Sequence, residues 1–383
     1  MKIAQITTTV NGGAGLAAVR LSEALNSIGA SASVISQRNE GGKTSLGSKL
    51  TTAFQSHVVQ AGEKLISTFS RTEMNLKKLD GFDVLHFHAT YNLINTKNLI
   101  RLAESRKIFI TMHDQRLVTG GCHYSGDCLQ FENICKGCPQ TNKSFRGLVS
   151  TEKLMINKLI GSKNVFLISP SSWLAELVQR STRTGNQISI IHNPIPQSNS
   201  QDINTFEFTR RLSQEKFVIG FVAANINNPA KGVDDLVSAL QQLPLTLQEK
   251  VHLLIVGRGR LNLKNNCFDY THIDNYIPGS EFNPYNKMNL LVVPSREDNS
   301  PNVIGEALMN NVRVLGSKIG GIPELLEVFG CPVVDTVDIR AFANSIQLEI
   351  LAVNQADYVK RAKAVFGYPV IGLKTLELYE SLL

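Results

Sequence analysis

The sequence predicts an α/β protein with two domains, each built around a parallel sheet. Short apolar runs alternate along the chain with amphipathic segments of helical period. With 383 residues the chain is long for one domain and suited to two. The strand–helix alternation restarts at Phe217, after a polar and irregular stretch from Pro194 to about Gln214.

The domain bounds follow from that restart. We assign 1–195 to an N-terminal Rossmann-like domain, 196–215 to a linker, 216–360 to a second Rossmann-like domain and 361–383 to a final helix. The strands expected in the first domain are Lys2–Thr8, Ser31–Ser36, Asp83–His88, Lys107–Met112, Val165–Ser169 and Ile188–His192. Those expected in the second are Phe217–Ala223, Val251–Val256, His272–Ile277, Leu290–Val293 and Arg313–Gly316.

Composition and charge restrict the partners. No apolar run approaches the roughly 20 residues that span a bilayer, and the start MKIAQITTTV lacks a signal-peptide pattern, so we expect a cytosolic protein. A net charge of +7 favours anionic partners. No basic–aromatic array of nucleic-acid type is present, so we expect an anionic membrane surface on the inner face rather than nucleic acid. The basic amphipathic segments 49–71 and 143–163 are the candidates for it, and packing within their own domain is the alternative.

The segment 290–326 carries the densest pattern. A buried strand is followed by a polar loop, then by Ser300 as expected N-cap and Pro301 at the first helical position. The helix runs to about Asn311, and the next strand leads into Gly320-Gly321. This βαβ unit places its loop at the carboxyl end of a strand, where open α/β sheets bind ligands.

Two carboxylates frame the start of that helix. Asp298 precedes it and Glu306 lies inside it, while helix-start amides hold phosphate and carboxylates accept from hydroxyls. A diphosphate with a hydroxyl-rich group at each end fits this layout, and an ordinary acidic first turn is the alternative. The residues expected to bind such a ligand here are Asn299, Ser300, Pro301, Asn302, Val303 and Glu306.

These residues resemble the signature of the retaining nucleotide-sugar glycosyltransferases of family 4, two acids separated by seven residues and followed by a Gly-Gly loop. The resemblance implies a GT-B fold, with two facing Rossmann-like domains and a C-terminal helix that packs back on the N-terminal domain. It implies that the first acid holds the donor sugar and that Glu306 holds the ribose. The first acid is Asp298 where the family has Glu, and Glu297 is out of register by one.

Further matches extend the resemblance over most of the chain. It implies that His113, after a strand, contacts the donor sugar, with His86 and His88 as secondary candidates. It implies that Lys231, before Gly232, binds the diphosphate. The family's usual arginine a few residues earlier is absent, so Arg258 or a backbone amide is expected to replace it. The glycine-rich loop containing Gly13 is expected to line the donor cleft, with a tight turn as the alternative.

A loop at 120–140 concentrates four of the six cysteines: Cys122, Cys128, Cys135 and Cys138. Four thiolates can hold a structural zinc ion that closes a polar loop. Free thiols or disulfides are the alternatives, and a reducing cytosol disfavours disulfides. Cys267 and Cys331 are expected in the core.

The predicted function is a retaining glycosyltransferase with His113, Lys231 and Asp298 in catalysis. It moves a sugar from a nucleotide-diphosphate donor to a hydroxyl of a lipid-linked or other glycan acceptor in surface polysaccharide synthesis, as the resemblance implies. Catalysis is expected to need no cofactor, because lysine and helix amides stabilise the leaving diphosphate. The alternative is a non-catalytic nucleotide-sugar-binding or scaffold protein on the same fold.

Overall fold

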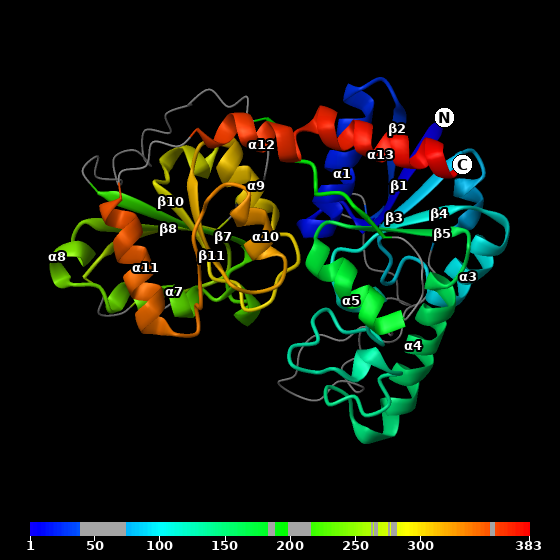
Figure 1. Ribbon diagram of the computed structural model, residues 1–383, viewed down its shortest axis with the longest axis horizontal. Coiled ribbons are helices and arrows are strands. Elements are labelled where there is room, and N and C mark those ends of the chain that lie inside the picture. Colours follow the sequence, from blue (N-terminus) through cyan, green and yellow to red (C-terminus); the bar gives the residue numbers. More distant parts are fainter. Residues whose placement is uncertain are drawn as a thin grey trace. The chain divides into compact units, whose positions relative to one another are not determined.

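The computed structural model describes residues 1–38, 74–182, 188–197, 216–261, 263, 267–274, 276, 282–352 and 357–383. The chain divides into two compact units. Unit 1 consists of Met1–Pro194 and Tyr368–Leu383, and unit 2 of Ile195–Gly367. Each unit contains one sheet of six parallel strands (Figure 1). The predicted α/β class with two parallel sheets is therefore confirmed.

The sheet of unit 1 has the order β2-β1-β3-β4-β5-β6. Its strands are β1 (Lys2–Thr9), β2 (Ser31–Arg38), β3 (Val84–Ala89), β4 (Ile108–Thr111), β5 (Val165–Ser169) and β6 (Ile188–Ile190). The helices are α1 (Gly12–Ser27), α3 (Thr96–Ser105), α4 (Arg146–Ile160), α5 (Ser172–Thr182) and α13 (Tyr368–Leu382). Short 3-10 turns are η1 (Leu76–Leu79), η2 (Gln115–Leu117), η3 (Gln130–Glu132) and η4 (Lys143–Phe145).

Both faces of this sheet are buried, because side chains alternate between the faces of a strand. Ile3, Val84 and Phe109 share a core cluster with residues of α1 and α13. Ala4 and Leu85 belong to the cluster on the other face, with residues of α3, α4 and α5. The final helix α13 is thus an integral part of unit 1.

The sheet of unit 2 has the order β12-β11-β10-β7-β8-β9. Its strands are β7 (Phe217–Asn225), β8 (Val251–Arg258), β9 (Asp269–Ile273), β10 (Leu290–Val293), β11 (Arg313–Ser317) and β12 (Val333–Val334). The helices are α7 (Val233–Gln241), α8 (Leu245–Gln248), α9 (Asn302–Met309), α10 (Ile322–Glu327), α11 (Ile339–Leu351) and α12 (Tyr358–Phe366), with 3-10 turns η5 (Pro229–Lys231) and η6 (Pro284–Lys287). Helices α9, α10 and α12 share one core cluster, and α7 and α11 the other.

Two helix starts differ from the prediction. Helix α1 begins at Gly12, so Gly13 lies in its first turn rather than in the expected loop before it. Helix α9 begins at Asn302, and Pro301 rather than Ser300 is its N-cap, without a side-chain cap bond. The amide of Ile304 donates to the carbonyl of Pro301, which makes Pro301 the first residue to enter the helical bonding pattern.

The C-terminal segment is two helices that belong to different units. Tyr358 and Phe366 of α12 lie in a core cluster of unit 2, whereas α13 packs against α1. The helices are separated at Gly367, whose backbone is extended. Unit 2 therefore ends at Gly367, seven residues beyond the 360 expected from the sequence, and α13 rather than the whole of 361–383 belongs to unit 1.

Some expected segments cannot be compared. The basic segment 49–71 and residues 198–215 of the expected linker lie outside the described residues. The strand expected at His272–Ile277 is observed as Asp269–Ile273. Within the ranges that the structure describes, no helix has the length and apolar character needed to cross a bilayer.

Candidate active site

The loops that carry Lys231 and Asp298 lie at the same edge of the unit 2 sheet. The chain passes from β7 to β8 on one side and, after β9, returns to β10 on the other side of β7. Open α/β sheets bind ligands at the carboxyl edge where the strand order reverses in this way. Lys231 follows β7 and Asp298 follows β10, so both flank the reversal.

These two side chains form an ion pair. The Nζ of Lys231 lies 2.6 Å from Oδ2 of Asp298. The hydroxyl of Ser295 also donates to Oδ2 over 3.2 Å, and the amide of Asn299 donates to Oδ1 over 3.1 Å. The carboxylate is buried, with 7% of Asp298 exposed. Three donors therefore fix the Asp298 carboxylate, while the lysine remains partly exposed to an incoming anion.

Glycines allow the loops of this site to approach one another. Gly320 has φ +64°, and a Cβ built on it would lie 1.7 Å from the backbone oxygen of Asp298. Gly232 has φ +71°, and its Cβ would lie 2.1 Å from the oxygen of Pro294. Only glycine meets both demands of left-handed backbone and close approach. The Gly-Gly loop thus packs on the backbone of Asp298, and Gly232 lets the Lys231 loop pack on the end of β10.

Glu306 is held by a residue that sequence reasoning missed. The hydroxyl of Tyr285 donates to Oε2 of Glu306 over 2.5 Å, and both residues are buried. Asn283 caps η6 by accepting from the amide of Tyr285. Asn283 also donates to Asn310, which donates to the Glu306 carbonyl. The Asn-Pro-Tyr sequence at 283–285 predicts a capped turn, but it does not predict that the tyrosine contacts α9.

The remaining expected donor residues of unit 2 lie around the start of α9. Asn299 is buried, and Ser300, Pro301, Asn302 and Val303 are half-buried. The first turn of α9 presents the positive end of its dipole here, which suits phosphate. The loop and first turn expected to bind the donor are therefore continuous with the Asp298 carboxylate.

Two arginines flank this site in different ways. Arg258 ends β8, the strand next to β7, and its side chain is exposed at the same edge. Arg296, which sequence reasoning missed, makes two bonds of 2.7 Å to the carboxylate of Asp235 in the first turn of α7. Those hydrogen bonds raise the pKa of Arg296. Arg296 thus ties the Asp298 loop to α7, and Arg258 lies one strand from the Lys231 loop.

In unit 1, polar side chains occupy one face of three neighbouring strands near their carboxyl ends. Gln5 of β1 pairs in register with His86 of β3, and His88 is two residues further on the same face. Thr111 and His113 continue this face at the end of β4. The face is the one covered by α1 and α13. Burying a polar side chain costs free energy unless the side chain is hydrogen-bonded. The polar side chains on this face are all hydrogen-bonded.

A network of hydrogen bonds joins these five side chains to Tyr379 of α13. His113 Nε2 lies 3.0 Å from His88 Nδ1, and His88 Nε2 lies 2.7 Å from Gln5 Oε1. Gln5 Nε2 donates to the Tyr379 hydroxyl over 3.2 Å. The same hydroxyl lies 2.6 Å from His86 Nδ1, and His86 Nε2 lies 2.7 Å from Thr111 Oγ1. His86 and His88, the secondary candidates from the sequence, are therefore buried hydrogen-bonding members of this network.

Burial keeps the three imidazoles neutral. It lowers the pKa of His86 to about 3 and that of His113 to about 4, and it lowers the pKa of His88 well below its usual range. At neutral pH His113 is therefore a hydrogen-bonding group rather than a cation.

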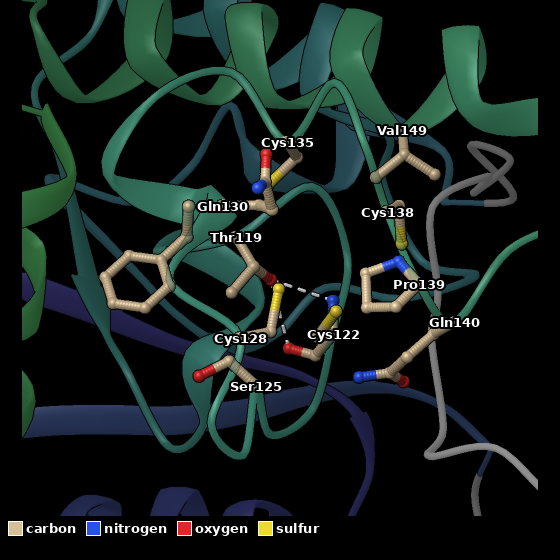
Figure 2. A pocket seen from close by; sticks show the side chains of 11 residues that line it. Thr119, Cys122, Ser125, Cys128, Gln130, Cys135, Cys138, Pro139, Gln140 and Val149 are labelled. Atoms are coloured by element: carbon tan, nitrogen blue, oxygen red, sulfur yellow. Dashed lines mark hydrogen bonds between the residues drawn. The ribbon is translucent and has the colours of Figure 1, made fainter.

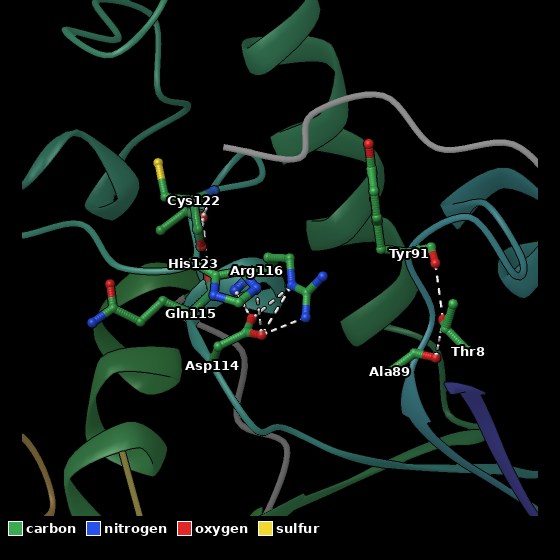
Figure 3. A network of polar contacts seen from close by, with 9 residues as sticks. Thr8, Ala89, Tyr91, Asp114, Gln115, Arg116, Cys122 and His123 are labelled. Carbon is green, nitrogen blue, oxygen red and sulfur yellow. Dashed lines mark hydrogen bonds and ion pairs between the residues drawn. The ribbon is translucent and has the colours of Figure 1, made fainter. Parts of the chain in front are cut away.

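The turn after His113 is fixed to the cysteine-rich loop. Figure 3 shows Arg116 and Asp114 facing each other, with bonds of 2.9 and 3.0 Å from Nε to the two carboxylate oxygens. His123 lies 3.5 Å from the same carboxylate. Although burial opposes it, the Arg116 charge and the neighbouring His123 hold the pKa of Asp114 at about 2. Sequence reasoning gave Arg116 and His123 no role.

Gly13 lies in the exposed first turn of α1, after β1. The strand order of unit 1 reverses between β2-β1 and β3, so this turn is at the ligand-binding edge of that sheet. The Thr8 hydroxyl bonds to the carbonyls of Ala89 and Tyr91 over 2.9 Å each and joins the ends of β1 and β3 there (Figure 3).

The four clustered cysteines line one pocket (Figure 2). Cys122, Cys135 and Cys138 are buried, Cys128 is half-buried, and the Thr141 hydroxyl lies 3.2 Å from Cys138 Sγ. In the part of the chain that the structure describes, no three His, Cys, Asp or Glu side chains are grouped so as to hold a metal ion. Zinc binding stays a prediction. Cys331 is buried as expected, but Cys267 is exposed, so its expected core position is wrong.

Comparison with known proteins identifies the second unit. Residues 216–350 match the family model described as "Glycosyl transferases group 1". Residues 216–350 are a group 1 glycosyl transferase domain. The Lys231–Asp298 pair, Arg258 and Glu306 all lie inside this domain, whereas Gly13, His113 and the cysteines precede it.

Similarity to known proteins extends beyond the group 1 domain. The chain is 24% identical over 334 residues to the glycosyl transferase WcaC of Escherichia coli (strain K12), assigned by name to colanic acid biosynthesis, with 82% of this chain and 79% of WcaC covered. Two solved structures share the fold of the whole chain. A sucrose-phosphate synthase of Thermosynechococcus elongatus has 16% identity and a TM-score of 0.67, covering 100% of this chain and 99% of its own. Anabaena HepE, in complex with UDP-glucose, has 17% identity and a TM-score of 0.61, covering 100% of both chains. The fold is the predicted GT-B class.

Proposed function

We propose that this protein is a retaining glycosyltransferase that moves a sugar from a nucleotide-diphosphate donor to a hydroxyl of a lipid-linked glycan in surface polysaccharide synthesis. The observation that carries the proposal is the Lys231–Asp298 pair at the strand-order reversal of a group 1 glycosyl transferase domain. The name of WcaC, in colanic acid biosynthesis, supports the polysaccharide part of the proposal. UDP-glucose bound to HepE supports the class of donor.

Donor binding uses the geometry of unit 2. The Lys231 ammonium exchanges the Asp298 carboxylate for the donor diphosphate, together with the first turn of α9 and Arg258. The released Asp298 carboxylate accepts hydrogen bonds from hydroxyls of the donor sugar. Glu306, oriented by Tyr285, accepts from the ribose hydroxyls.

Catalysis follows from the growth of negative charge on the departing diphosphate. Lys231 and the helix dipole stabilise that charge more in the transition state than in the ground state, so no metal is required for the reaction. The departing phosphate accepts the proton of the acceptor hydroxyl, which gives retention without a carboxylate nucleophile. His113, a neutral imidazole, contacts the donor sugar as the family resemblance implies, and Gly13 lines the same ligand-binding edge of unit 1.

A structural role is proposed for the four cysteines. Their side chains line one pocket, and thiolates are preferred ligands of zinc. The described side chains are not grouped closely enough to hold a metal ion, so binding of one ion there would require the four thiols to turn toward one another. The loop they belong to is bonded to the turn after His113 through His123 and Asp114. Zinc would stabilise that turn and take no part in transfer.

The protein is proposed to act at an anionic cytoplasmic membrane surface. The net charge of +7 and the exposed side of α4 support this. Leu148 and Leu154 on that helix are 39% and 52% exposed, and Lys158 is exposed beside them. Lys153 is one of the basic residues for which the segment 143–163 was expected to lie on a membrane. It is fully buried and donates to Asn157, so for this residue the expectation is wrong.

The decisive experiment is turnover of labelled nucleotide sugars, screened first for UDP-glucose and then for other donors, with and without glycan–lipid extracts. We expect one donor to be hydrolysed slowly and transferred rapidly when the acceptor is present. Binding of a donor without hydrolysis or transfer by any acceptor fraction would favour the non-catalytic binding protein.

A further inference from the structure

A second group of polar side chains lies at the carboxyl edge of the unit 1 sheet, apart from the buried histidines. It consists of Tyr91 after β3, Arg116 in η2 after β4, and His123 and Tyr124 of the cysteine-rich loop. The strand order reverses at β1, and open α/β sheets bind ligands at this edge of such a reversal. The Thr8 hydroxyl at the end of β1 lies 2.9 Å from the Tyr91 carbonyl oxygen, so Tyr91 lies beside the reversal.

Arg116 uses only part of its hydrogen-bonding capacity within the described residues. A guanidinium carries five N–H donors. Nε lies 2.9 and 3.0 Å from the two carboxylate oxygens of Asp114, and Nη2 lies 2.5 Å from one of them. Figure 3 shows Nη1 on the side away from Asp114, and no described residue accepts a hydrogen bond from it. With 23% of the side chain exposed, the edge formed by Nη1 and Nη2 offers a ligand two parallel donors, which fit a carboxylate or a phosphate.

The surrounding contacts hold this guanidinium in place. The Asp114 side chain, besides its ion pair, caps η2 by accepting from an amide of that turn. The Gln115 side chain accepts from the Ser125 amide over 2.6 Å, and the Gln115 amide donates to the His123 carbonyl over 3.0 Å. Tyr124, between those two residues, is therefore held beside η2. A pre-oriented group loses little freedom when a ligand binds, which favours affinity.

Two phenol rings lie near the guanidinium. Although burial opposes it, Asp114 raises the pKa of Arg116. The phenols of Tyr91 and Tyr124 add to this rise in pKa, so both lie close to the charge. Both tyrosines are half-buried, and the ring centroids of His123 and Tyr124 lie 5.8 Å apart in an edge-to-face arrangement. A half-buried phenol offers a ring face to the C–H groups of a sugar and a hydroxyl to its oxygens.

We propose that this group of side chains in unit 1 binds the acceptor glycan through an acidic group. The Nη1–Nη2 edge of Arg116 pairs with a carboxylate or phosphate on the sugar, and Tyr91 and Tyr124 contact the sugar ring. The role as acceptor site rests on the proposed function, whereas binding of an acidic sugar to unit 1 does not. Asp114 already balances the charge of Arg116, so selection comes from the two parallel hydrogen bonds. A neutral sugar lacks the charged partner that makes such bonds strong.

Binding of small sugars to the full chain tests the site without donor or turnover. The probes are methyl glucuronoside, methyl glucoside 6-phosphate, neutral methyl glucoside and inorganic phosphate, titrated by saturation-transfer NMR. We expect at least one acidic sugar to bind about tenfold or more tightly than methyl glucoside, the effect of a hydrogen bond to a charged group. Tighter binding of the glucuronoside assigns a carboxylate to the acceptor, and tighter binding of the sugar phosphate assigns a phosphate. Equal binding of all three sugars, or of inorganic phosphate and the acidic sugars, overturns the proposal.

Arg116→Lys is the decisive variant, because lysine keeps the charge beside Asp114 but lacks the planar pair of donors. It should lose the preference for acidic sugars. Arg101→Lys, at an exposed position of α3 in the same unit, is the matched control and should keep the preference. Lys231→Ala should keep it as well, which separates this site from the diphosphate site of unit 2. A preference that persists in Arg116→Lys, or that is lost in Lys231→Ala, overturns the proposal. If Arg116→Lys fails to fold, the wild-type comparison of acidic and neutral sugars still decides.

Transfer kinetics test the acceptor role separately. Arg116→Lys is expected to raise the acceptor KM about tenfold, with kcat within about twofold of wild type and with unchanged hydrolysis of donor in the absence of acceptor. Arg101→Lys should match wild type in all three quantities. An unchanged acceptor KM in Arg116→Lys overturns the acceptor role. If wild type transfers no sugar to any acceptor, the proposed function fails, while binding of the probes still decides whether unit 1 holds an acidic sugar.

Discussion

Lys231 Nζ lies 2.6 Å from Asp298 Oδ2, so the cation expected to bind the donor diphosphate is paired with the carboxylate expected to bind the donor sugar. Asp298 is buried and Lys231 is partly exposed, and each neutralises the other. In the proposed function a donor would replace both partners, so the pair would couple recognition of the diphosphate to recognition of the sugar.

Lys231→Ala is expected to lower kcat about 10²-fold or more, with a smaller change in donor affinity. The reason is that charge on the leaving diphosphate grows in the transition state. Lys250→Ala removes the same charge at the amino end of β8, the opposite edge of the sheet, and should keep wild-type activity. Asp298→Glu, the acid usual in the family, should remain active. Equal trace rates in wild type and Lys231→Ala would contradict catalysis.

Glu306→Gln is expected to weaken donor binding about tenfold or more, because a charged acceptor of hydrogen bonds contributes about 1.5–3 kcal/mol. Calorimetry with the nucleoside diphosphate measures this. Tyr285→Phe should weaken binding less, since it loosens the carboxylate without removing it. Unchanged affinity in Glu306→Gln would remove Glu306 from the ribose site.

Purified protein is expected to carry about one zinc ion per chain, and a chelator should lower the melting temperature. Cys135→Ser should abolish the metal, whereas Cys267→Ser, at an exposed position, should retain it. Metal analysis is the measurement. Absence of zinc together with reaction of all four thiols under native conditions would end the proposal.

Unit 1 is expected to lose stability as the pH falls below about 6.5, the ordinary histidine value. The unfolded chain then binds protons that His86 and His88 do not bind until far lower pH, so the free energy of unfolding decreases with decreasing pH. Each fully buried histidine contributes up to about 1.4 kcal/mol per pH unit. Urea unfolding monitored by Trp173, the single tryptophan, reports on this unit.

Asp114 should lower the free energy of unfolding further as the pH falls below about 4. Its pKa is about 2 in the folded state, where its carboxylate is stabilised, so the unfolded chain takes up the proton first. His88→Gln should make the dependence between pH 6 and 5 shallower. Equal stability of wild type at pH 7 and 5 would mean that the histidines are not buried as neutral groups.

Binding to anionic vesicles is expected to weaken steeply with salt, because exposed basic residues contribute about 1 kcal/mol each and are screened. Lys158→Ala should weaken the binding, whereas Lys250→Ala, at an exposed lysine of unit 2, should not. Vesicle co-sedimentation measures this. Strong binding to neutral vesicles would instead indicate burial of apolar side chains, and no binding to either would leave α4 an ordinary surface helix.

The sequence by itself determined the two parallel sheets and the edge at which the site lies. Apolar strands alternating with helices specify a parallel sheet, and the carboxyl ends of parallel strands share one edge. Together with the family resemblance, this edge assigned Lys231, Asp298 and Glu306 to one candidate site from the sequence. Their loops also carried local signals, such as Gly232 and the Gly-Gly pair.

Only the tertiary structure decided which side chains meet. Lys231 bonds to Asp298, Tyr285 to Glu306, and Tyr379 to Gln5 and His86, across separations that no local pattern encodes. Lys153 was expected on the exposed basic side of its segment because the helical pattern shows only which residues are polar. It does not show that Asn157 can accept a hydrogen bond from the buried ammonium. Backbone periodicity is a short-range property of the chain, whereas hydrogen-bond partners depend on how the elements pack, and the chemistry of this protein lies in those partners.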